Sequence, residues 1–312
     1  MARIFLQKAA NGYRVVRGEL VRALQQRLKQ AVHSPGIIDG IFGNDTETAL
    51  KSFQIARGLA PTGKLTDETW LALMTTPTPT IFDRCLQLTA DFEGHGFRTI
   101  AGNFDGAGLT WGLIGYTLQH GEIQKILTEV REHDSQLFDS AFGDLKPQIL
   151  AQLGKPWPEQ LQWANSISIG TNKVRIEERW QQAFATLGDD PAVQQIQLRR
   201  VNQYWERGAR DAARFIIQTE AGIALCFDIA VQNGGIDHDA EERRITEWIN
   251  DNPGTNERDL LIRMADVVAE NSRPQYVEDV RKRKRTIATG DGNVHGARYA
   301  TRDWGIGEGP HV

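Results

Sequence analysis

The stretch "FEGHGFRTIAGNFDGAGLTWG" (residues 92–112) decides the fold of the larger part of this chain. It holds two acidic residues, Glu93 and Asp105, among glycines and aromatic residues. The segment "IFDRCLQLTADFE" (81–93) predicts a helix with Glu93 at its C-terminal end, where Gly94 stops it. The glycines that follow predict a tight β-hairpin or small sheet, because they allow the positive φ angles of sharp bends. Such a hairpin folds back on the helix end and carries Asp105 with it.

Glycoside hydrolases typically use two carboxyl groups in contrasting surroundings, one protonated and one ionised. The negative end of the helix dipole and nearby aromatic residues favour the protonated form of Glu93, which suits a general acid. The polar "DGAG" turn keeps Asp105 ionised, so it can activate water or act as a nucleophile. Thr110, five residues after Asp105, can direct its hydroxyl into the groove between the two acids. Spacing alone leaves open that Glu93 is an inert helix-end charge and Asp105 a turn former.

The composition is that of a soluble globular protein, with 312 residues, 40% apolar and 24% charged. Residues 1–80 hold ten Lys/Arg and six Asp/Glu, a net charge of +4. Since the whole chain has a net charge of −4, residues 81–312 carry −8. This weak asymmetry suits an anionic wall polymer, and we expect no nucleic-acid partner. No apolar run reaches about 18 residues, so we expect no membrane span.

The N-terminus lacks an apolar stretch of signal-peptide length. We therefore expect synthesis in the host cytoplasm, with access to the cell wall by holin-type release or delivery. We also expect a monomer without a cofactor. We expect no metal site, because the seven histidines are scattered and neither cysteine has metal-ligand spacing.

The segment "TTPTPT" (75–80) predicts an extended linker. We expect an N-terminal binding domain over 1–76, a linker over 77–80 and a catalytic domain over 81–312. The fold class we expect is mainly α, because helical patterns recur through the second part with glycine-rich interruptions. "RKRKR" (281–285) is interpreted as a solvated helix end.

The first part contains three short helical patterns. In "ELVRALQQRLKQAV" (19–32), leucines and a valine recur every four residues up to Val32. Asp45 and Thr66 are the expected N-caps of the next two helices. "GIFGNDTETAL" (40–50) and "GKLTDETWLAL" (63–73) align without gaps, which indicates a repeated unit of glycine turn, hydrophobic plug and capped helix.

This part resembles the three-helix peptidoglycan-binding domains of bacteria. The residues that match the family pattern are Asp39, Gly40, Phe42, Gly43, Thr46, Ala49, Phe53, Gln54, Gly58, Leu59, Thr62, Gly63, Thr69 and Trp70. The resemblance implies binding to bacterial peptidoglycan. Within the motif, Asp39 and Phe42 are our candidates for contact with this ligand.

The second part resembles the chitosanases of glycoside-hydrolase family 46 and, more distantly, phage-type lysozymes. "DGAGLTWG" (105–112) matches the part of their pattern that carries the general base and a threonine that helps hold its water. The resemblance implies that Glu93 is the general acid, Asp105 the general base and Thr110 that threonine. It also implies an α-rich, two-lobed lysozyme/chitosanase-like domain with a small β-hairpin or sheet at the cleft.

A second match to the chitosanases lies in "FDIAVQNGG" (227–235), which resembles a core helix that ends beside the cleft. Gln232 and Asn233 are therefore candidates for sugar hydrogen bonds. The segment between the two acids is shorter than in chitosanases and lacks the acidic residues that grip glucosamine ammonium groups. This departure favours an acetylated glycan, and the attached binding domain favours peptidoglycan.

The hypothesis preferred from the sequence is a peptidoglycan-cleaving muramidase of the endolysin type. A chitosanase is the next alternative, and a lytic transglycosylase would need Glu93 but not Asp105. An amidase or peptidase would require a zinc cluster or a Cys–His pair, and neither pattern is present. A non-enzymatic wall-binding protein also remains open.

Overall fold

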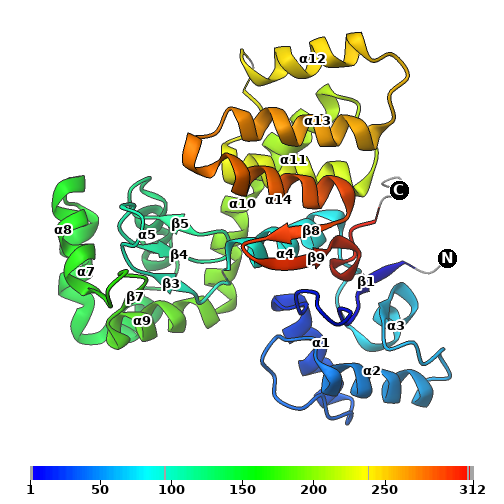
Figure 1. Ribbon diagram of the computed structural model, residues 1–312. Coiled ribbons are helices and arrows are strands. Elements are labelled where there is room, and N and C mark those ends of the chain that lie inside the picture. Colours follow the sequence, from blue (N-terminus) through cyan, green and yellow to red (C-terminus); the bar gives the residue numbers. More distant parts are fainter. Residues whose placement is uncertain (1–2, 95, 238, 308, 310–312) are drawn as a thin grey trace. The chain divides into compact units, whose positions relative to one another are not determined.

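The computed structural model describes residues 3–94, 96–237, 239–307 and 309, and it is mainly α-helical, as the sequence predicts (Figure 1). The chain forms two compact units, each described here by itself. The first holds the residues up to Phe92 and those from Tyr204 onward, and the second spans Glu93–Gln203. The proposed division into domains 1–76 and 81–312 with a 77–80 linker remains a prediction.

The N-terminal module of the first unit consists of three helices and a two-stranded sheet. The helices are α1 (Glu19–Gln30), α2 (Asn44–Ala56) and α3 (Asp67–Leu73), and β1 (Ile4–Leu6) pairs with β2 (Leu65–Thr66). Apolar side chains from all three helices and both strands form its core. These buried residues include Phe5, Leu24, Leu28, Phe42, Phe53 and Trp70.

Helix boundaries in this module confirm one prediction and correct two. Thr66 caps α3, because its side chain accepts a hydrogen bond from Thr69 N. The N-cap of α2 is Gly43, so Asp45 lies in the first turn, where the helix dipole still favours it. Helix α1 ends at Gln30, and Val32, with φ +65°, is 92% exposed instead of continuing the buried face.

The rest of the first unit is a helical lobe with a terminal hairpin. It contains α4 (Ile81–Glu93, whose last residue belongs to the second unit), α11 (Glu220–Asn233), α12 (Glu241–Asp251), α13 (Glu257–Glu270) and α14 (Val277–Thr289). Helix α13 packs on α11, α12 and α14 (Figure 1). The 3₁₀ turn Pro274–Tyr276 leads into α14, and the glycine-rich tail forms the antiparallel pair β8 (Asp291–Val294) and β9 (Ala297–Ala300). The 3₁₀ turn Thr301–Trp304 follows, and it buries Trp304 completely.

The second unit combines a three-stranded sheet and a two-stranded sheet with helices. Strands β3 (Ile100–Ala101), β4 (Thr110–Trp111) and β5 (Tyr116–Thr117) form the small antiparallel sheet that the glycines predict. The other elements of this unit follow in chain order: α5 (Glu122–His133), α6 (Ser135–Phe142), the 3₁₀ turn Gly143–Leu145, α7 (Lys146–Leu153), α8 (Trp157–Ile167), β6 (Ser168–Ile169), β7 (Arg175–Ile176), α9 (Glu178–Asp189) and α10 (Pro191–Arg214), which continues into the first unit.

An aromatic core fixes this sheet on the helices. Trp111 is fully buried and its ring meets Phe184 of α9 edge-on at 5.1 Å. The Tyr116 hydroxyl donates a 2.5 Å hydrogen bond to the carbonyl of Gln197 in α10. Paired residues of antiparallel strands share a face, and Trp111 lies opposite Ile100 and Tyr116. The sheet therefore packs this face against the helices of its own unit.

Candidate functional site

Helix α4 places Glu93 at its last position, as the sequence predicts. Thr80 and Asp83 form a reciprocal cap at the other end, since Thr80 Oγ1 accepts from Asp83 N at 3.2 Å and Asp83 Oδ2 accepts from Thr80 N at 2.8 Å. Residues from Arg84 to Phe92 are buried, while Glu93 is half-buried. Gly94, with φ +70°, ends the helix in the left-handed conformation.

A buried ionic cluster lies beside the last two turns of α4. Asp228 of α11 is fully buried and accepts hydrogen bonds from Arg283 at 2.7 Å and from Lys284 at 2.5 Å. Thr89 of α4 adds a 3.1 Å hydrogen bond from its hydroxyl to Asp228 Oδ1. Burial opposes ionisation of Asp228, but the two cations outweigh it and hold the pKa of this carboxyl well below its usual range.

This cluster corrects the interpretation of "RKRKR" as a solvated helix end. Arg283 and Lys284 are completely buried, and only their neighbours on the other face of α14 reach solvent. The overlooked signal is Asp228, an acid within the apolar run "ALCFDIAV", because a buried charge requires a partner of opposite charge. The guanidinium of Arg283 also lies over the ring of Phe92, 5.2 Å from its centre, and so contacts the residue before Glu93.

The two candidates for sugar contacts at the end of α11 differ in their surroundings. Gln232 Oε1 accepts a 2.8 Å hydrogen bond from Lys284 Nζ, so this oxygen belongs to the ionic cluster. Asn233 Nδ2 reaches Ser272 Oγ at 3.4 Å, whereas its buried Oδ1 has no hydrogen-bond partner among the described residues. Both side chains are partly exposed, and their contact with a sugar remains a prediction.

Asp105 lies at the exposed tip of the connection between β3 and β4. Its Oδ1 accepts a 3.0 Å hydrogen bond from Ala107 N, a local turn that sets the direction of the carboxylate. Gly106 and Gly108 both have positive φ angles, +90° and +82°, as expected for this bend.

Asn103 anchors the Asp105 loop to α8 and to the following hairpin. Its Oδ1 accepts from Gly108 N at 2.9 Å, and its Nδ2 donates to Asn165 Oδ1 at 2.9 Å. Asn165 Oδ1 also accepts from Lys173 Nζ at 2.8 Å. Gly102 donates its N–H to Val174 O at 2.8 Å, so both sides of the loop base are fixed within the second unit.

Thr110 follows the loop directly and is buried in β4. It pairs with Ala101 on one side and with Thr117 on the other. Because successive side chains of a strand alternate, Thr110 lies on the face opposite to Trp111, away from the aromatic core. Asp105 and Thr110 therefore come from one hairpin, and the chain reaches it seven residues after Glu93.

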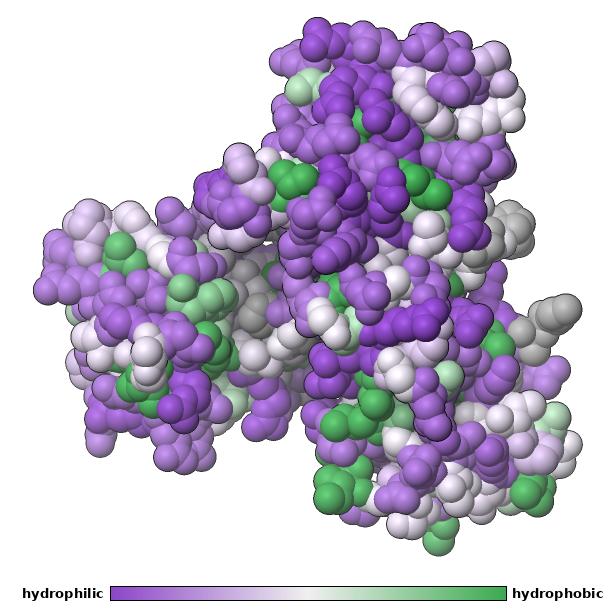
Figure 2. All heavy atoms as spheres, in the orientation of Figure 1, coloured by the Kyte–Doolittle hydropathy of each residue, from purple (hydrophilic) through white to green (hydrophobic). Residues whose placement is uncertain are grey.

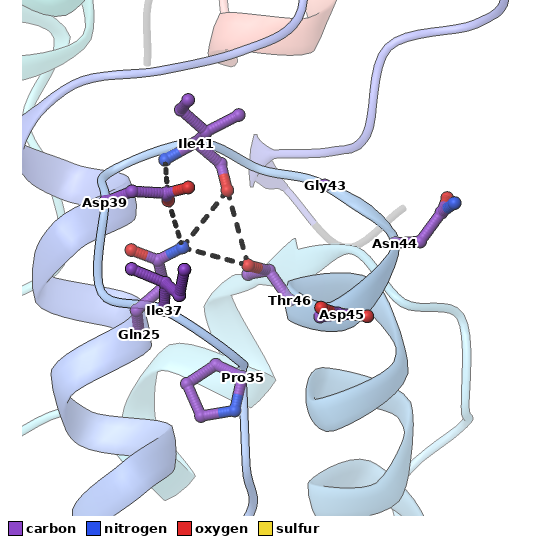
Figure 3. Close-up of a pocket in the computed structure, with 9 residues that line it drawn as sticks. All are labelled: Gln25, Pro35, Ile37, Asp39, Ile41, Gly43, Asn44, Asp45 and Thr46. Atoms are coloured by element: carbon purple, nitrogen blue, oxygen red, sulfur yellow. Dashed lines mark hydrogen bonds between the residues drawn. The ribbon is translucent and has the colours of Figure 1, made fainter.

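A second candidate site is a pocket of about 310 Å³ in the N-terminal module (Figure 3). It lies between the segment before α2 and the first turn of that helix, and its lining residues are Gln25, Pro35, Ile37, Asp39, Ile41, Gly43, Asn44, Asp45 and Thr46. Burial opposes ionisation of Asp39, but hydrogen bonds from Gln25 Nε2 at 2.9 Å and Ile41 N at 2.8 Å together outweigh it and lower the pKa of this carboxyl. The pocket thus presents a fixed carboxylate.

Two exposed isoleucines are among the residues that line this pocket. Ile37 is 80% exposed and Ile41 39% exposed. The module shows further apolar areas on the face seen in Figure 2. Phe42, in contrast, is fully buried, so the structure corrects its assignment as a ligand contact: its side chain forms the plug of the module core.

The described residues contain no group of three or more His, Cys, Asp or Glu side chains placed to hold a metal ion. Within the same described part of the chain, every helix is too short or too polar to cross a membrane.

Comparison with known proteins gives a family for the module. Residues 17–73 match the family model PG_binding_1, described as "Putative peptidoglycan binding domain". This match supports peptidoglycan as the ligand of the N-terminal module. A search of the curated proteins finds no match to the chain.

Two solved structures show similarity to a large part of the chain. The first is a family 46 chitosanase from Gynuella sunshinyii in complex with chitotetraose, with 19% identity, a TM-score of 0.48, and coverage of 69% of this chain and 88% of that one. The second is a mutant chitosanase from Bacillus subtilis complexed with six glucosamine units, with 14% identity, a TM-score of 0.45, and coverage of 72% and 100%.

Proposed function

We propose that this protein is a glycoside hydrolase that cleaves the glycan strands of bacterial peptidoglycan, as a muramidase of the endolysin type. The observation that carries the proposal is the combination, in one chain, of a peptidoglycan-binding domain with a helix-end carboxyl and a hairpin carboxylate. Access to the wall by holin-type release or delivery belongs to the same proposal.

Glu93 is the general acid in this proposal. Its carboxyl is half-buried at the last position of α4, and a carboxyl group held on a helix can be directed at the bond to be cleaved. Glu93 donates its proton to the glycosidic oxygen, so the bond to the anomeric carbon breaks and the leaving sugar departs as an alcohol.

Asp105 is the general base. It is exposed in a polar turn, and the hydrogen bond from Ala107 N orients its carboxylate. A carboxylate in this position can accept a proton from water. Asp105 takes a proton from water as the water oxygen attacks the anomeric carbon, and Thr110 helps to hold that water. One water is consumed for each bond cleaved, and a new reducing end results.

The pocket around Asp39 contributes retention at the wall. Its carboxylate suits an ammonium or amide group of the peptide stems, and Ile37 and Ile41 offer apolar contact. Gln232 and Asn233 are proposed as sugar contacts near the ionic cluster.

Mass spectrometry of the soluble products from purified peptidoglycan tests this function. The proposal expects new reducing muramic-acid ends with the wild type, and their loss in Asp105→Asn. Asp144→Asn is the matched control, because Asp144 is an exposed acid of the same unit. Anhydro-muramic ends that persist in Asp105→Asn would indicate a lytic transglycosylase. Release of oligomers from chitosan, with no products from peptidoglycan, would favour a chitosanase, the activity that the "DGAGLTWG" resemblance also suggests.

A further inference from the structure

Asp91, in the last turn of α4, is a buried carboxylate with partners from two distant parts of the chain. Its side chain is 1% exposed. Arg14 Nε lies 3.1 Å from Oδ2, Arg17 Nε 3.3 Å from Oδ1, and the Tyr299 hydroxyl donates to Oδ2 at 2.7 Å. Both cations come from the segment that precedes α1, within the same unit as Asp91.

This segment is fastened independently of Asp91. Arg14 N donates to the carbonyl of Arg298 in β9 at 2.6 Å. The Tyr13 hydroxyl donates to Asp291 Oδ2 at 2.6 Å, and the guanidinium of Arg298 lies 4.6 Å from the centre of the Tyr13 ring. The two arginines therefore reach Asp91 from a fixed backbone and not from a loose tail.

The next residue, Phe92, is held as well. Its ring meets that of Tyr299 at 4.8 Å, in addition to its contact with Arg283. Successive residues of an α-helix are turned by about 100°, so clamps on Asp91 and Phe92 fix the rotation of the last turn. Helix ends otherwise fray, and Glu93 is the terminal residue of this turn.

We propose that Arg14 and Arg17 are positioning residues for Glu93: by binding Asp91 they fix the last turn of α4 and with it the direction of the Glu93 carboxyl. The inference rests on the function proposed above for Glu93. Catalytic groups tolerate displacements of only a fraction of an ångström, so a loosened last turn lowers the rate of the chemical step. The segment before α1 thereby helps to position the proposed general acid.

The experiment compares the full-length wild type with Arg14→Gln/Arg17→Gln. The control is Lys29→Gln/Arg57→Gln, which removes the same charge from exposed positions of the same module. Arg14→Lys/Arg17→Lys keeps the charge, and Tyr299→Phe removes one hydrogen bond to Asp91 but retains the ring. Two readouts are amide hydrogen exchange along α4 without any ligand, and kcat and KM on soluble peptidoglycan fragments and on glucosamine hexamer.

The expected result for Arg14→Gln/Arg17→Gln is a loss of exchange protection confined to the last turn of α4, with kcat lowered about tenfold and KM changed less than twofold. Tyr299→Phe shows the same pattern with a smaller loss, the lysine pair recovers most of kcat, and the control equals the wild type. Unchanged protection at the end of α4, or normal kcat despite lost protection, would overturn the inference. Should the wild type leave the peptidoglycan fragments uncleaved, the proposed function fails, while the exchange data still decide whether the arginines fix the last turn.

Discussion

Gln25 and Gln54 make corresponding hydrogen bonds to the two copies of the internal repeat of the N-terminal module. Gln25 Nε2 donates to Asp39 Oδ1, Ile41 O and Thr46 Oγ1, and its Oε1 accepts from Gly40 N. Gln54 makes the same set of hydrogen bonds with the partners 23 positions later, Thr62 Oγ1, Lys64 O, Thr69 Oγ1 and Gly63 N. The alignment of 40–50 with 63–73 thus reflects a duplicated turn. Only the first turn offers its glutamine a carboxylate, Asp39, where the second offers the Thr62 hydroxyl.

Because the turn is duplicated, we expect Gln25→Ala and Gln54→Ala to lower the stability of the protein equally but to differ in their effect on wall binding. Gln25→Ala and Gln54→Ala each leave buried polar groups unsatisfied, so each lowers the free energy of unfolding by about 2–4 kcal/mol. Urea unfolding measures this loss, with Gln26→Ala on the exposed side of α1 as control. Only Gln25→Ala also weakens binding to purified cell walls, because Gln25 orients Asp39. Equal binding by both variants would argue against the Asp39 pocket.

The buried ion cluster predicts a pH-dependent stability. Asp228→Asn leaves Arg283 and Lys284 buried without their counter-ion and lowers the free energy of unfolding at pH 7 by about 3–5 kcal/mol. The folded-state pKa of Asp228 is depressed, so its stabilisation is complete above the unfolded value of about 4 and declines as the pH falls below it. In urea titrations, the difference in the free energy of unfolding between wild type and Asp228→Asn therefore becomes smaller as the pH falls from about 4 to about 2. A constant difference over that range would contradict this assignment.

Gly102, at the base of the Asp105 loop, should not tolerate a larger side chain without loss of activity. A Cβ atom at Gly102 would lie 2.4 Å from Lys173 O and 2.6 Å from Ser168 Oγ, so Gly102→Ala displaces the loop. We expect roughly a 10- to 100-fold drop in kcat on peptidoglycan. Gly154→Ala is the control, since a Cβ there meets no atom within 4 Å and its φ is −96°. Full activity in Gly102→Ala would separate the loop from catalysis.

We expect removal of residues 1–80 to lower the stability of the remaining chain as well as its binding to the cell wall. The truncated chain lacks Arg14 and Arg17, which pair with Asp91. It also lacks strand β1, which packs against the 3₁₀ turn Thr301–Trp304. An uncompensated buried carboxylate costs about 3–5 kcal/mol, so residues 81–312 alone should unfold roughly 10 °C lower in calorimetry. Asp39→Ala, in contrast, should lower the unfolding temperature less than the truncation and lose wall binding. An unchanged temperature in the truncated chain would show that the module is only an attachment.

Local sequence patterns predicted the elements that carry the candidate acids. Helix α4 follows from its apolar pattern and the glycine after Glu93, and the small sheet follows from the glycines around Asp105, because both signals lie within a few residues of the structure they specify. The buried state of Arg283 and Lys284 was not predictable in this way, since their partner Asp228 lies about 55 residues earlier. The contacts of Asp91 with Arg14 and Tyr299 are equally long-range and leave no periodic trace.

The rate of peptidoglycan hydrolysis by Glu93→Gln tests the central claim most directly. Glu93→Gln keeps the size of the side chain and removes its acidic proton, and Glu132→Gln serves as the control at an exposed position of α5. The account predicts that Glu93→Gln releases reducing ends from purified sacculi at least about 100-fold more slowly than wild type, with unchanged wall binding and unfolding temperature, while Glu132→Gln is normal. Hydrolysis by Glu93→Gln at the wild-type rate would contradict it.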